Sequence, residues 1–314
     1  LNVTHLNGVI LTHTDKDHAG GIMALATSSV AVDAWYASAY FVNMKRSKHP
    51  AVLAAALRGQ EVVWLKGGDA LPVPVGTLAV LGPIVEDEKE NNDSLVLRLD
   101  VNGGSMLLAG DMEFPEEQTL LGADLLAPCT VLKVGNHAND DATSAAFINA
   151  VKPKLAIIST NSDDEPDTPS ARILTLLKSA GAQIALTQSA QGALRTTLTG
   201  TSATIEAIAF TPSAQTLSLT LSDKSVAQDA VTLRNDGTAV ADLGGCFIAS
   251  SRGGEVFVFP VGATLASGAS CTVTSYASED AGDYVWPDDR VWHKSKDDQA
   301  RLYDAWGRLL SVLD

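Results

Sequence analysis

Four side chains of the kinds that bind metal ions lie within six residues near the start of the chain. They belong to the run Leu-Thr-His-Thr-Asp-Lys-Asp-His-Ala-Gly-Gly at residues 11–21 and are His13, Asp15, Asp17 and His18. Imidazole and carboxylate groups bind Zn²⁺ or Mn²⁺ well, and two such ions ~3.5–4 Å apart can hold a hydroxide that attacks a phosphoryl or acyl group. A solvated polar turn with a capping Asp is the alternative, but the density of ligands favours a metal site.

The ligands lie on a turn between a strand and a helix. The apolar run at residues 8–12 predicts a short buried strand, and the sequence from His18 onward predicts the first turns of a helix. Helix and strand patterns alternate beyond it, with helices predicted at 22–27 and 51–58, strands at 30–36, 61–65 and 78–81, and turns near 67–76. This alternation predicts an α/β layered structure.

The motif His-x-Asp-x-Asp-His-x-Gly-Gly resembles the metal signature of the metallo-β-lactamase superfamily. With Asp at the second ligand position, it is similar to the variant found in the extracytoplasmic domain of ComEC-type DNA-uptake proteins. The resemblance extends over residues 1–210 and implies a metallo-β-lactamase αβ/βα sandwich. Proteins of this family have strands before the motif, and the chain starts at Leu1 without Met. We therefore expect a fragment or processed product that lacks the first strands, and with them any targeting signal.

A second group of residues matches the family between residues 91 and 111. The sequence predicts strands at 91–99 and 105–111, joined by a hairpin turn at 102–104, and the second strand ends on Gly110-Asp111. In the resembled family, a strand that begins Asn-x-Ser-Leu leads to a strand that ends Gly-Asp, whose Asp bridges two metal ions. The resemblance implies this role for Asp111. Ser94 matches a family position, where it either serves the site or satisfies backbone groups.

A third group departs from the family at one position. A predicted strand at residues 130–134 runs into a polar loop, where the family pattern resembles Leu-Lys-Val-x-His-His-Gly-Ser. The chain keeps Lys133 and His137 but has Asn136 where the first His is expected. An Asn carbonyl can bind a hard ion, but Asn is a poor zinc ligand and cannot act as a general base. Lys133 either faces phosphate charge or lies on the outer face of its strand.

A fourth group departs from the family as well. A strand is predicted at residues 154–160, and Thr168-Pro169 opens a helix predicted over 170–180. The resembled family tends to carry His-Pro here, so Thr168 replaces a histidine that reaches the active site. The strands predicted at 181–187 and 192–198 match the closing strands of the family. Asp141 is predicted to cap a helix that begins at residue 142. The alternative is that Asp141 supports a metal ligand by a hydrogen bond.

The C-terminal third has the pattern of a different fold. From about residue 213, short Val/Leu/Thr strands alternate with turns at 235–237, 244–245, 253–254 and 262, which predicts a β-sandwich. Segments at 231–237, 242–248, 265–268 and 300–307 resemble a lamin-tail domain, an immunoglobulin-like module, with Cys246 in place of the usual Trp. We expect this domain over residues 211–314, with core anchors at Trp286, Trp292 and Trp306. Nothing in this domain resembles a catalytic constellation: His293 is a lone histidine, and solvated loop acids are expected at Asp288, Asp289, Asp297 and Asp298.

Composition limits the classes of function. The 314 residues are 46% hydrophobic, enough for a core, and no apolar run approaches the ~18 residues of a membrane span. The net charge is −15, divided as −9 over residues 1–214 and −6 over residues 215–314. Phosphate contacts are made mostly by Lys and Arg, so a nuclease with this charge would bind DNA weakly or locally, through its metals. Of the three cysteines, Cys246 and Cys271 either pair or stay as buried thiols like Cys129.

The resemblance implies a metal-dependent hydrolase with two zinc ions, or manganese, whose favoured substrates are phosphodiester bonds in nucleic acid or small molecules. One metal ion would be held by His13, Asp15 and His137 and the other by Asp17 and His18, with Asp111 between them. Asp17 and Asp111 are the expected catalytic residues, since Asp17 could orient the hydroxide or accept a proton. The residues expected to contact substrate or to support the ligands are Ser94, Lys133, Asn136 and Thr168.

Two other functions fit the same sequence. In the first, the replaced histidines leave a degenerate metal site, and the lamin-tail domain does the work by binding protein or cell-surface material. In the second, the metal site hydrolyses a small ester or lactam, which the sequence alone does not distinguish from a phosphodiester. For all three functions we expect a bacterial protein that is secreted or belongs to the cell envelope. His5 and His49 lack ligand neighbours and are expected to serve packing or the surface.

Overall fold

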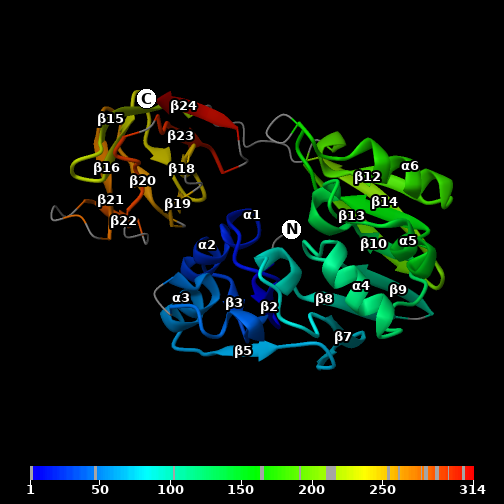
Figure 1. Ribbon diagram of the computed structural model, residues 1–314. Coiled ribbons are helices and arrows are strands. Elements are labelled where there is room, and N and C mark those ends of the chain that lie inside the picture. Colours follow the sequence, from blue (N-terminus) through cyan, green and yellow to red (C-terminus); the bar gives the residue numbers. More distant parts are fainter. Residues whose placement is uncertain are drawn as a thin grey trace. The chain divides into compact units, whose positions relative to one another are not determined.

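The computed structural model describes residues 3–45, 48–101, 103–162, 166–190, 192–209, 217–252, 255–260, 262–276, 278, 282–286, 290–295, 297–305 and 308–314 (Figure 1). The chain divides into two compact units, one of residues 7–14 and 32–210 and the other of residues 1–6, 15–31 and 211–314. The expected boundary at residue 210 falls outside the described residues. None of the helices in the described part combines the length and apolar character needed to cross a membrane.

The first unit is built on a seven-stranded sheet in the order β12-β11-β10-β9-β8-β7-β6. Its strands are β6 (Ala70–Val73), β7 (Gly76–Gly82), β8 (Val96–Val101), β9 (Gly104–Leu108), β10 (Val131–Lys133), β11 (Leu155–Ile158) and β12 (Gln183–Leu186). Strands β6 to β9 are antiparallel, whereas β9, β10, β11 and β12 are parallel to one another. The carboxyl ends of these four parallel strands therefore lie at one edge of the sheet.

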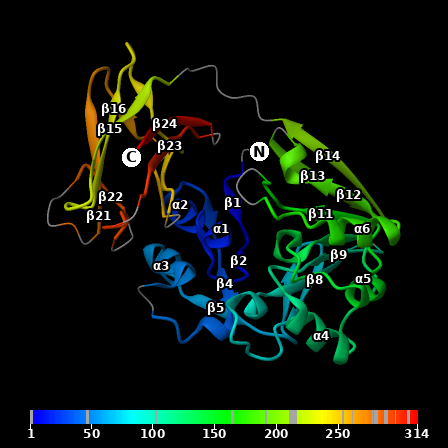
Figure 2. The same ribbon diagram turned by 45° about the horizontal axis from the view of Figure 1, so that its top comes forward.

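Three helices pack on one face of this sheet, namely α4 (Phe114–Gly122), α5 (Ala145–Val151) and α6 (Ala171–Ser179), as Figure 2 shows. Each contributes fully buried side chains to a core shared with the strands, such as Leu120 and Phe147 from the helices and Leu107 and Leu132 from the sheet. The side chain of Ser144 accepts a hydrogen bond from the Phe147 amide and so caps α5. The hairpin of β13 (Gly192–Thr199) and β14 (Ser202–Ala209) ends this unit.

The other face meets a three-stranded parallel sheet of β2 (Val9–Leu11), β4 (Trp35–Ser38) and β5 (Val62–Leu65), on which α3 (Pro50–Leu57) packs. Ile10 and Tyr36 of this sheet pack in one cluster with Leu78 and Leu97 of the larger sheet. The Leu95 amide also donates a hydrogen bond to the Thr12 carbonyl, 3.1 Å away. Two packed sheets with helices outside them form the predicted αβ/βα sandwich.

The second unit contains α1 (Lys16–Ala19), α2 (Ile22–Thr27), the short strand β1 (His5–Leu6), which pairs with β3 (Ala31–Val32), and a β-sandwich. One sheet of the sandwich has the order β15 (Leu219–Ser225), β16 (Ala230–Asn235), β21 (Ser270–Ser275), β22 (Tyr284–Trp286). The other has the order β19 (Val256–Val258), β18 (Phe247–Ser250), β23 (Ala300–Tyr303), β24 (Leu309–Leu313), and β17 (Ala241–Asp242) pairs with β20 (Thr264–Leu265). The predicted all-β C-terminal fold is confirmed.

Two tryptophans form the centre of this sandwich core. Trp286 and Trp292 are 1% exposed and meet edge to face with ring centroids 5.6 Å apart. Cys246 lies in the same core, as its place in the pattern predicts. Trp306, Asp288, Asp289 and the turn at 253–254 lie outside the described residues.

The three cysteines, Cys129, Cys246 and Cys271, are free and buried, so the pairing of the last two is not formed. Burial raises the pKa of the Cys129 thiol to about 12 and the pKa values of Cys246 and Cys271 to about 11.

Several local predictions were wrong for identifiable reasons. Asp298 is not a solvated loop acid: it is 5% exposed, and its carboxylate accepts hydrogen bonds from the Ser250 hydroxyl and the Arg252 and His293 amides. Asp141 does not cap a helix, because α5 begins three residues beyond residue 142 and Ser144 caps it. The stretch at 67–76 contains strand β6 as well as turns, and residues 90–93 form a 3₁₀ turn before β8.

Candidate metal centre

Two of the expected ligands, His13 and His137, converge on the carboxylate of a third, Asp111. His13 follows β2, Asp111 lies three residues after β9, and His137 lies in a 3₁₀ turn, Gly135–Ala138, that follows β10. His13 Nε2 is 3.8 Å from Asp111 Oδ2, and His137 Nε2 is 3.3 Å from the same oxygen. His13 is fully buried and Asp111 is 3% exposed. The structure therefore brings together two imidazoles and a carboxylate in a largely buried place.

A hydrogen bond at the ring nitrogen that faces away from Asp111 fixes the orientation of His137. Its Nδ1 lies 2.7 Å from the carbonyl oxygen of Ser159, at the end of β11. A carbonyl can only accept a hydrogen bond, so Nδ1 carries a proton, and in the neutral imidazole Nε2 is then the nitrogen that can bind a metal. Metal-binding histidines almost always donate their second nitrogen in this way.

The backbone around His137 adopts an uncommon conformation. Asn136, His137 and Ala138 have positive φ values of 42°, 51° and 63°. Residues other than glycine rarely adopt this left-handed region, and each costs on the order of 1 kcal/mol or more. Strain of this kind gathers at functional sites, where the surrounding structure holds it. Here the Ser159 contact and the Asn136 amide, which donates to Gly110 O at 3.3 Å, hold the loop.

Asp111 is positioned by two residues predicted to support the site. Its backbone amide donates a hydrogen bond to Ser94 Oγ at 3.3 Å. Lys133 Nζ donates to the Gly110 carbonyl at 2.9 Å and lies 3.5 Å from Asp111 Oδ1. Lys133 therefore faces the site rather than the outer face of its strand. Gly110 has a φ of 54°, and a Cβ there would lie 2.9 Å from the Ser94 Cβ.

The two residues that replace family histidines are bonded to other groups. Asn136 is buried, and its side-chain nitrogen donates to Asp141 Oδ1 at 3.0 Å. The Thr168 hydroxyl shares a hydrogen bond of 2.9 Å with Thr160, and the Thr168 carbonyl accepts one from Ser162. Both residues lie beside the carboxyl ends of the parallel strands.

The remaining motif residues belong to the second compact unit, at the start of α1. Asp15 holds the N-cap position, but its side chain makes no capping bond, which removes the capping alternative for that carboxylate. His18 Nε2 lies 3.3 Å from Asp17 Oδ2.

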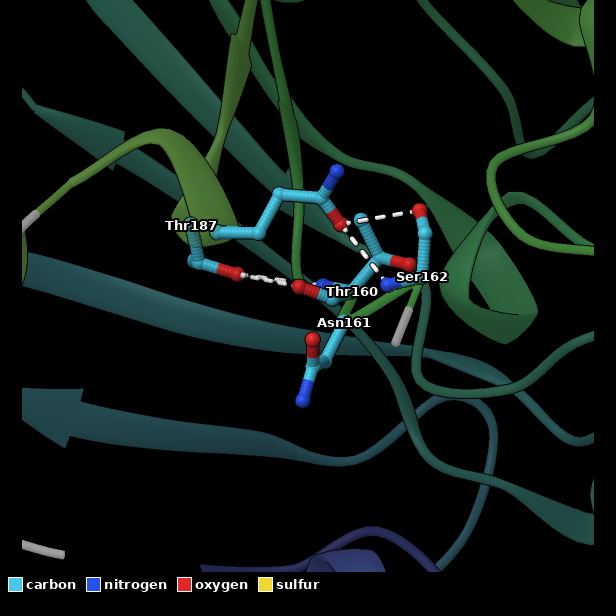
Figure 3. Close-up of a pocket in the computed structure, with 5 residues that line it drawn as sticks. Thr160, Asn161, Ser162 and Thr187 are labelled. Atoms are coloured by element: carbon cyan, nitrogen blue, oxygen red, sulfur yellow. Dashed lines mark hydrogen bonds between the residues drawn. The ribbon is translucent and has the colours of Figure 1, made fainter. Parts of the chain in front are cut away.

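The structure adds candidate site residues that the motifs did not identify. Ser159 acts through its carbonyl, so its side-chain type carries no signal. A polar pocket of about 380 Å³, lined by Thr160, Asn161, Ser162, Thr187 and Gln188, opens beyond it (Figure 3). The rule that ligands bind at the carboxyl ends of parallel strands would have pointed to these residues.

Comparisons with known proteins agree with this description. Residues 1–162 match the family model described as Metallo-beta-lactamase superfamily, and residues 203–314 match that of the Lamin Tail Domain, which confirms both resemblances.

Two curated relatives are named ComE operon protein 3 and Competence protein ComA. ComE operon protein 3 of Bacillus subtilis (strain 168) is 32% identical over 177 residues, which cover 56% of this chain and 23% of the relative. Competence protein ComA of Neisseria gonorrhoeae is 24% identical over 202 residues, which cover 63% of this chain and 25% of the relative. The chain thus spans about a quarter of the length of these two relatives.

One of the solved structures that are similar to this chain is CmlA, a diiron beta-hydroxylase from Streptomyces venezuelae. It is 11% identical, with a TM-score of 0.40, over 58% of this chain and 43% of that chain.

Proposed function

Because the chain belongs to the metallo-beta-lactamase superfamily, we propose that it is a binuclear metal-dependent hydrolase of phosphodiester bonds, with nucleic acid as the first substrate class. The observation that carries this proposal is the buried convergence of His13 and His137 on Asp111. A buried carboxylate is costly unless cations compensate it, and two imidazole nitrogens beside it form a donor set that suits zinc. The resemblance of the motif to ComEC-type DNA-uptake proteins, together with the match to Competence protein ComA, supports nucleic acid as the substrate.

The proposed ligand set joins the two parts of the motif. His13, Asp15 and His137 would hold one zinc ion, or manganese in its place, Asp17 and His18 would hold the second, and Asp111 would serve both. Only one residue separates His13 from Asp15 along the chain, and the family signature contains all four motif residues. The Ser159 bond, which selects the tautomer with Nε2 as the ligand nitrogen, supports the role of that nitrogen as a ligand.

Bound metal ions supply Lewis acidity and lower the pKa of a coordinated water. The residues of the chain do the rest. Lys133, with its ammonium beside Asp111, attracts the phosphate of the substrate. Asp17, whose side chain is 51% exposed, accepts a proton from the attacking water in our proposal. Asn136 donates a hydrogen bond to Asp141 through its side-chain amide and takes no part in proton transfer.

A second candidate function follows from Asn136 and Thr168. Both replace family histidines, and both use their side chains in hydrogen bonds to Asp141 and Thr160. In this candidate the metal site is degenerate, and the lamin-tail domain binds protein or cell-surface material. In both candidates we propose that the protein acts outside the cell or in the cell envelope.

Metal content and hydrolysis measured on the same full-length preparation test the proposal. We expect close to two equivalents of zinc or manganese per chain by elemental mass spectrometry, and metal-dependent cleavage of single-stranded DNA and of bis(p-nitrophenyl) phosphate. Asp111→Asn should lose both while keeping the circular dichroism of the parent. One equivalent or less, not raised by added metal, together with no cleavage, favours the degenerate site.

A further inference from the structure

The polar pocket lies at the same sheet edge as the metal ligands. Thr160, Asn161 and Ser162 follow β11, and Thr187 and Gln188 lie in the 3₁₀ turn after β12. Strands β10, β11 and β12 are parallel neighbours, so these residues continue the line of strand ends that starts with His137. Adjacent strands are about 4.8 Å apart, which places the pocket one to two strand spacings beyond that ligand.

A direct connection joins the pocket to the metal centre. Ser159, whose carbonyl holds His137 Nδ1 at 2.7 Å, directly precedes Thr160 of the pocket wall. Thr168, which replaces a family histidine, bonds to Thr160 through its hydroxyl and to Ser162 through its carbonyl. A substrate group bound in the pocket would therefore lie next to the group bound at the metals.

Internal hydrogen bonds hold the pocket walls in place (Figure 3). The Thr160 amide donates to Thr187 Oγ1 at 3.0 Å, and the Ser162 amide donates to Gln188 Oε1 at 3.0 Å. These bonds join the ends of β11 and β12. A site formed before the ligand arrives loses less conformational entropy on binding.

The groups that line the pocket select a neutral polar ligand. All five side chains are hydroxyls or amides, and none carries a charge. A second phosphate would call for Lys or Arg, which make most phosphate contacts. Because Gln188 Oε1 accepts the Ser162 amide, the two N–H donors of Gln188 Nε2 face elsewhere, and no described residue accepts from them.

We propose that this pocket binds the nucleoside part of the substrate while its phosphodiester lies at the metal centre. Amide side chains pair well with the carbonyl and ring nitrogen atoms of nucleobases, and Gln188 Nε2 offers the donors for a base carbonyl. The inference rests on the proposed phosphodiesterase function and goes beyond it, because it names a nucleoside-bearing diester as the preferred substrate and Gln188 as a specificity-determining residue.

The test compares two diesters on the metal-loaded full chain. One is thymidine 5′-(p-nitrophenyl phosphate), and the other is bis(p-nitrophenyl) phosphate, which has no nucleoside. Gln188→Ala should raise KM for the thymidine diester roughly 3- to 10-fold, the range of one or two neutral hydrogen bonds, and leave the other diester unchanged. Gln183→Ala is the matched control, because Gln183 is an exposed glutamine at the opposite end of β12. An equal effect of Gln188→Ala on both diesters, or no effect, overturns the inference.

A binding measurement separates failure of this inference from failure of the proposed function. If neither diester is cleaved, the hydrolase proposal fails, and calorimetry on the same protein then decides the pocket with thymidine 5′-monophosphate and phenyl phosphate. We expect the nucleotide to bind more tightly than phenyl phosphate, with the difference lost in Gln188→Ala. Equal affinities for the two probes in the parent chain would contradict a nucleoside subsite.

Discussion

The imidazole of His137 and the carbonyl of Ser159 form a 2.7 Å hydrogen bond between the loop after β10 and the end of β11. This bond fixes the tautomer that a metal ligand needs and ties the strained loop to the central sheet. Because the partner is a backbone carbonyl, substitution of the serine side chain leaves it in place. The metal centre therefore depends on the parallel pairing of β10 with β11 as well as on the ligands themselves.

His137→Ala should weaken metal binding, whereas Ser159→Ala should not. We expect a loss of metal affinity of at least roughly 10- to 100-fold for the first, since that range is typical of removing only a group that supports a metal ligand. Competition with a chromophoric chelator measures this affinity. Equal metal affinity in the two variants would mean that His137 is not a ligand.

Lys133→Met should lower hydrolysis about 10-fold or more at unchanged metal content. Removal of one preorganised donor near the reacting group typically costs this much or more, and Lys133 is 3.5 Å from Asp111. Lys154→Met provides the control, because Lys154 lies just before the opposite end of β11, exposed, where its ammonium contacts Thr201. Steady-state rates on bis(p-nitrophenyl) phosphate should show a loss for Lys133→Met alone, and unchanged rates for it would remove Lys133 from the reaction.

Asn136→His should raise the zinc content of the purified chain. The substitution restores a side chain that the family carries, and histidine tolerates the left-handed backbone of this position better than most residues do. The lost bond to Asp141 should lower the free energy of unfolding by about 1 kcal/mol. Asn139→His, three residues along the same loop, is the control for an added imidazole. An unchanged zinc content would show that residue 136 does not reach the metal.

Glu116→Gln should stabilise the protein increasingly as pH rises from 5 to 8. Burial raises the pKa of Glu116 to about 8, with the charges of Asp93 and Asp87 adding to the shift. A raised carboxyl pKa means that the folded state prefers the protonated form, so its stabilising contribution is complete below about pH 4.5 and is lost as pH rises through about 8.

The variant removes this titration, and each pKa unit corresponds to about 1.4 kcal/mol. Urea unfolding at pH 5, 6.5 and 8 should show the difference from the parent growing with pH by on the order of 1 kcal/mol or more. Glu61→Gln, at an exposed glutamate, should show no such trend. A difference that does not change with pH would place the charge of Glu116 in contact with solvent.

The sequence predicted the fold correctly where the hydrophobic periodicity of a segment agrees with the turn residues at its ends. The helix at 22–27 and the strands on either side of Asp111 followed from local pattern, and the family signature added the sandwich. The edge strand β6 was missed because a short element that contains Pro and is flanked by Gly looks like a loop, and the 3₁₀ turn before β8 lies where the start of that strand was predicted.

The candidate site was less accessible to sequence than the fold. The pattern identified ligand types, but it could not show which way Lys133 points, since a strand side chain can take either face. The contact with the Ser159 carbonyl and the pocket at Gln188 arise from parallel pairing between segments that are distant in the chain. No single stretch of residues contains that information.

The buried thiols of Cys129, Cys246 and Cys271 have a practical consequence for work on this protein. With pKa values of about 11 to 12, they stay protonated at neutral pH, and a buried, protonated thiol reacts slowly with peroxide or maleimide. A single cysteine introduced on the surface could be labelled selectively with a fluorophore or spin probe, without first removing the natural three.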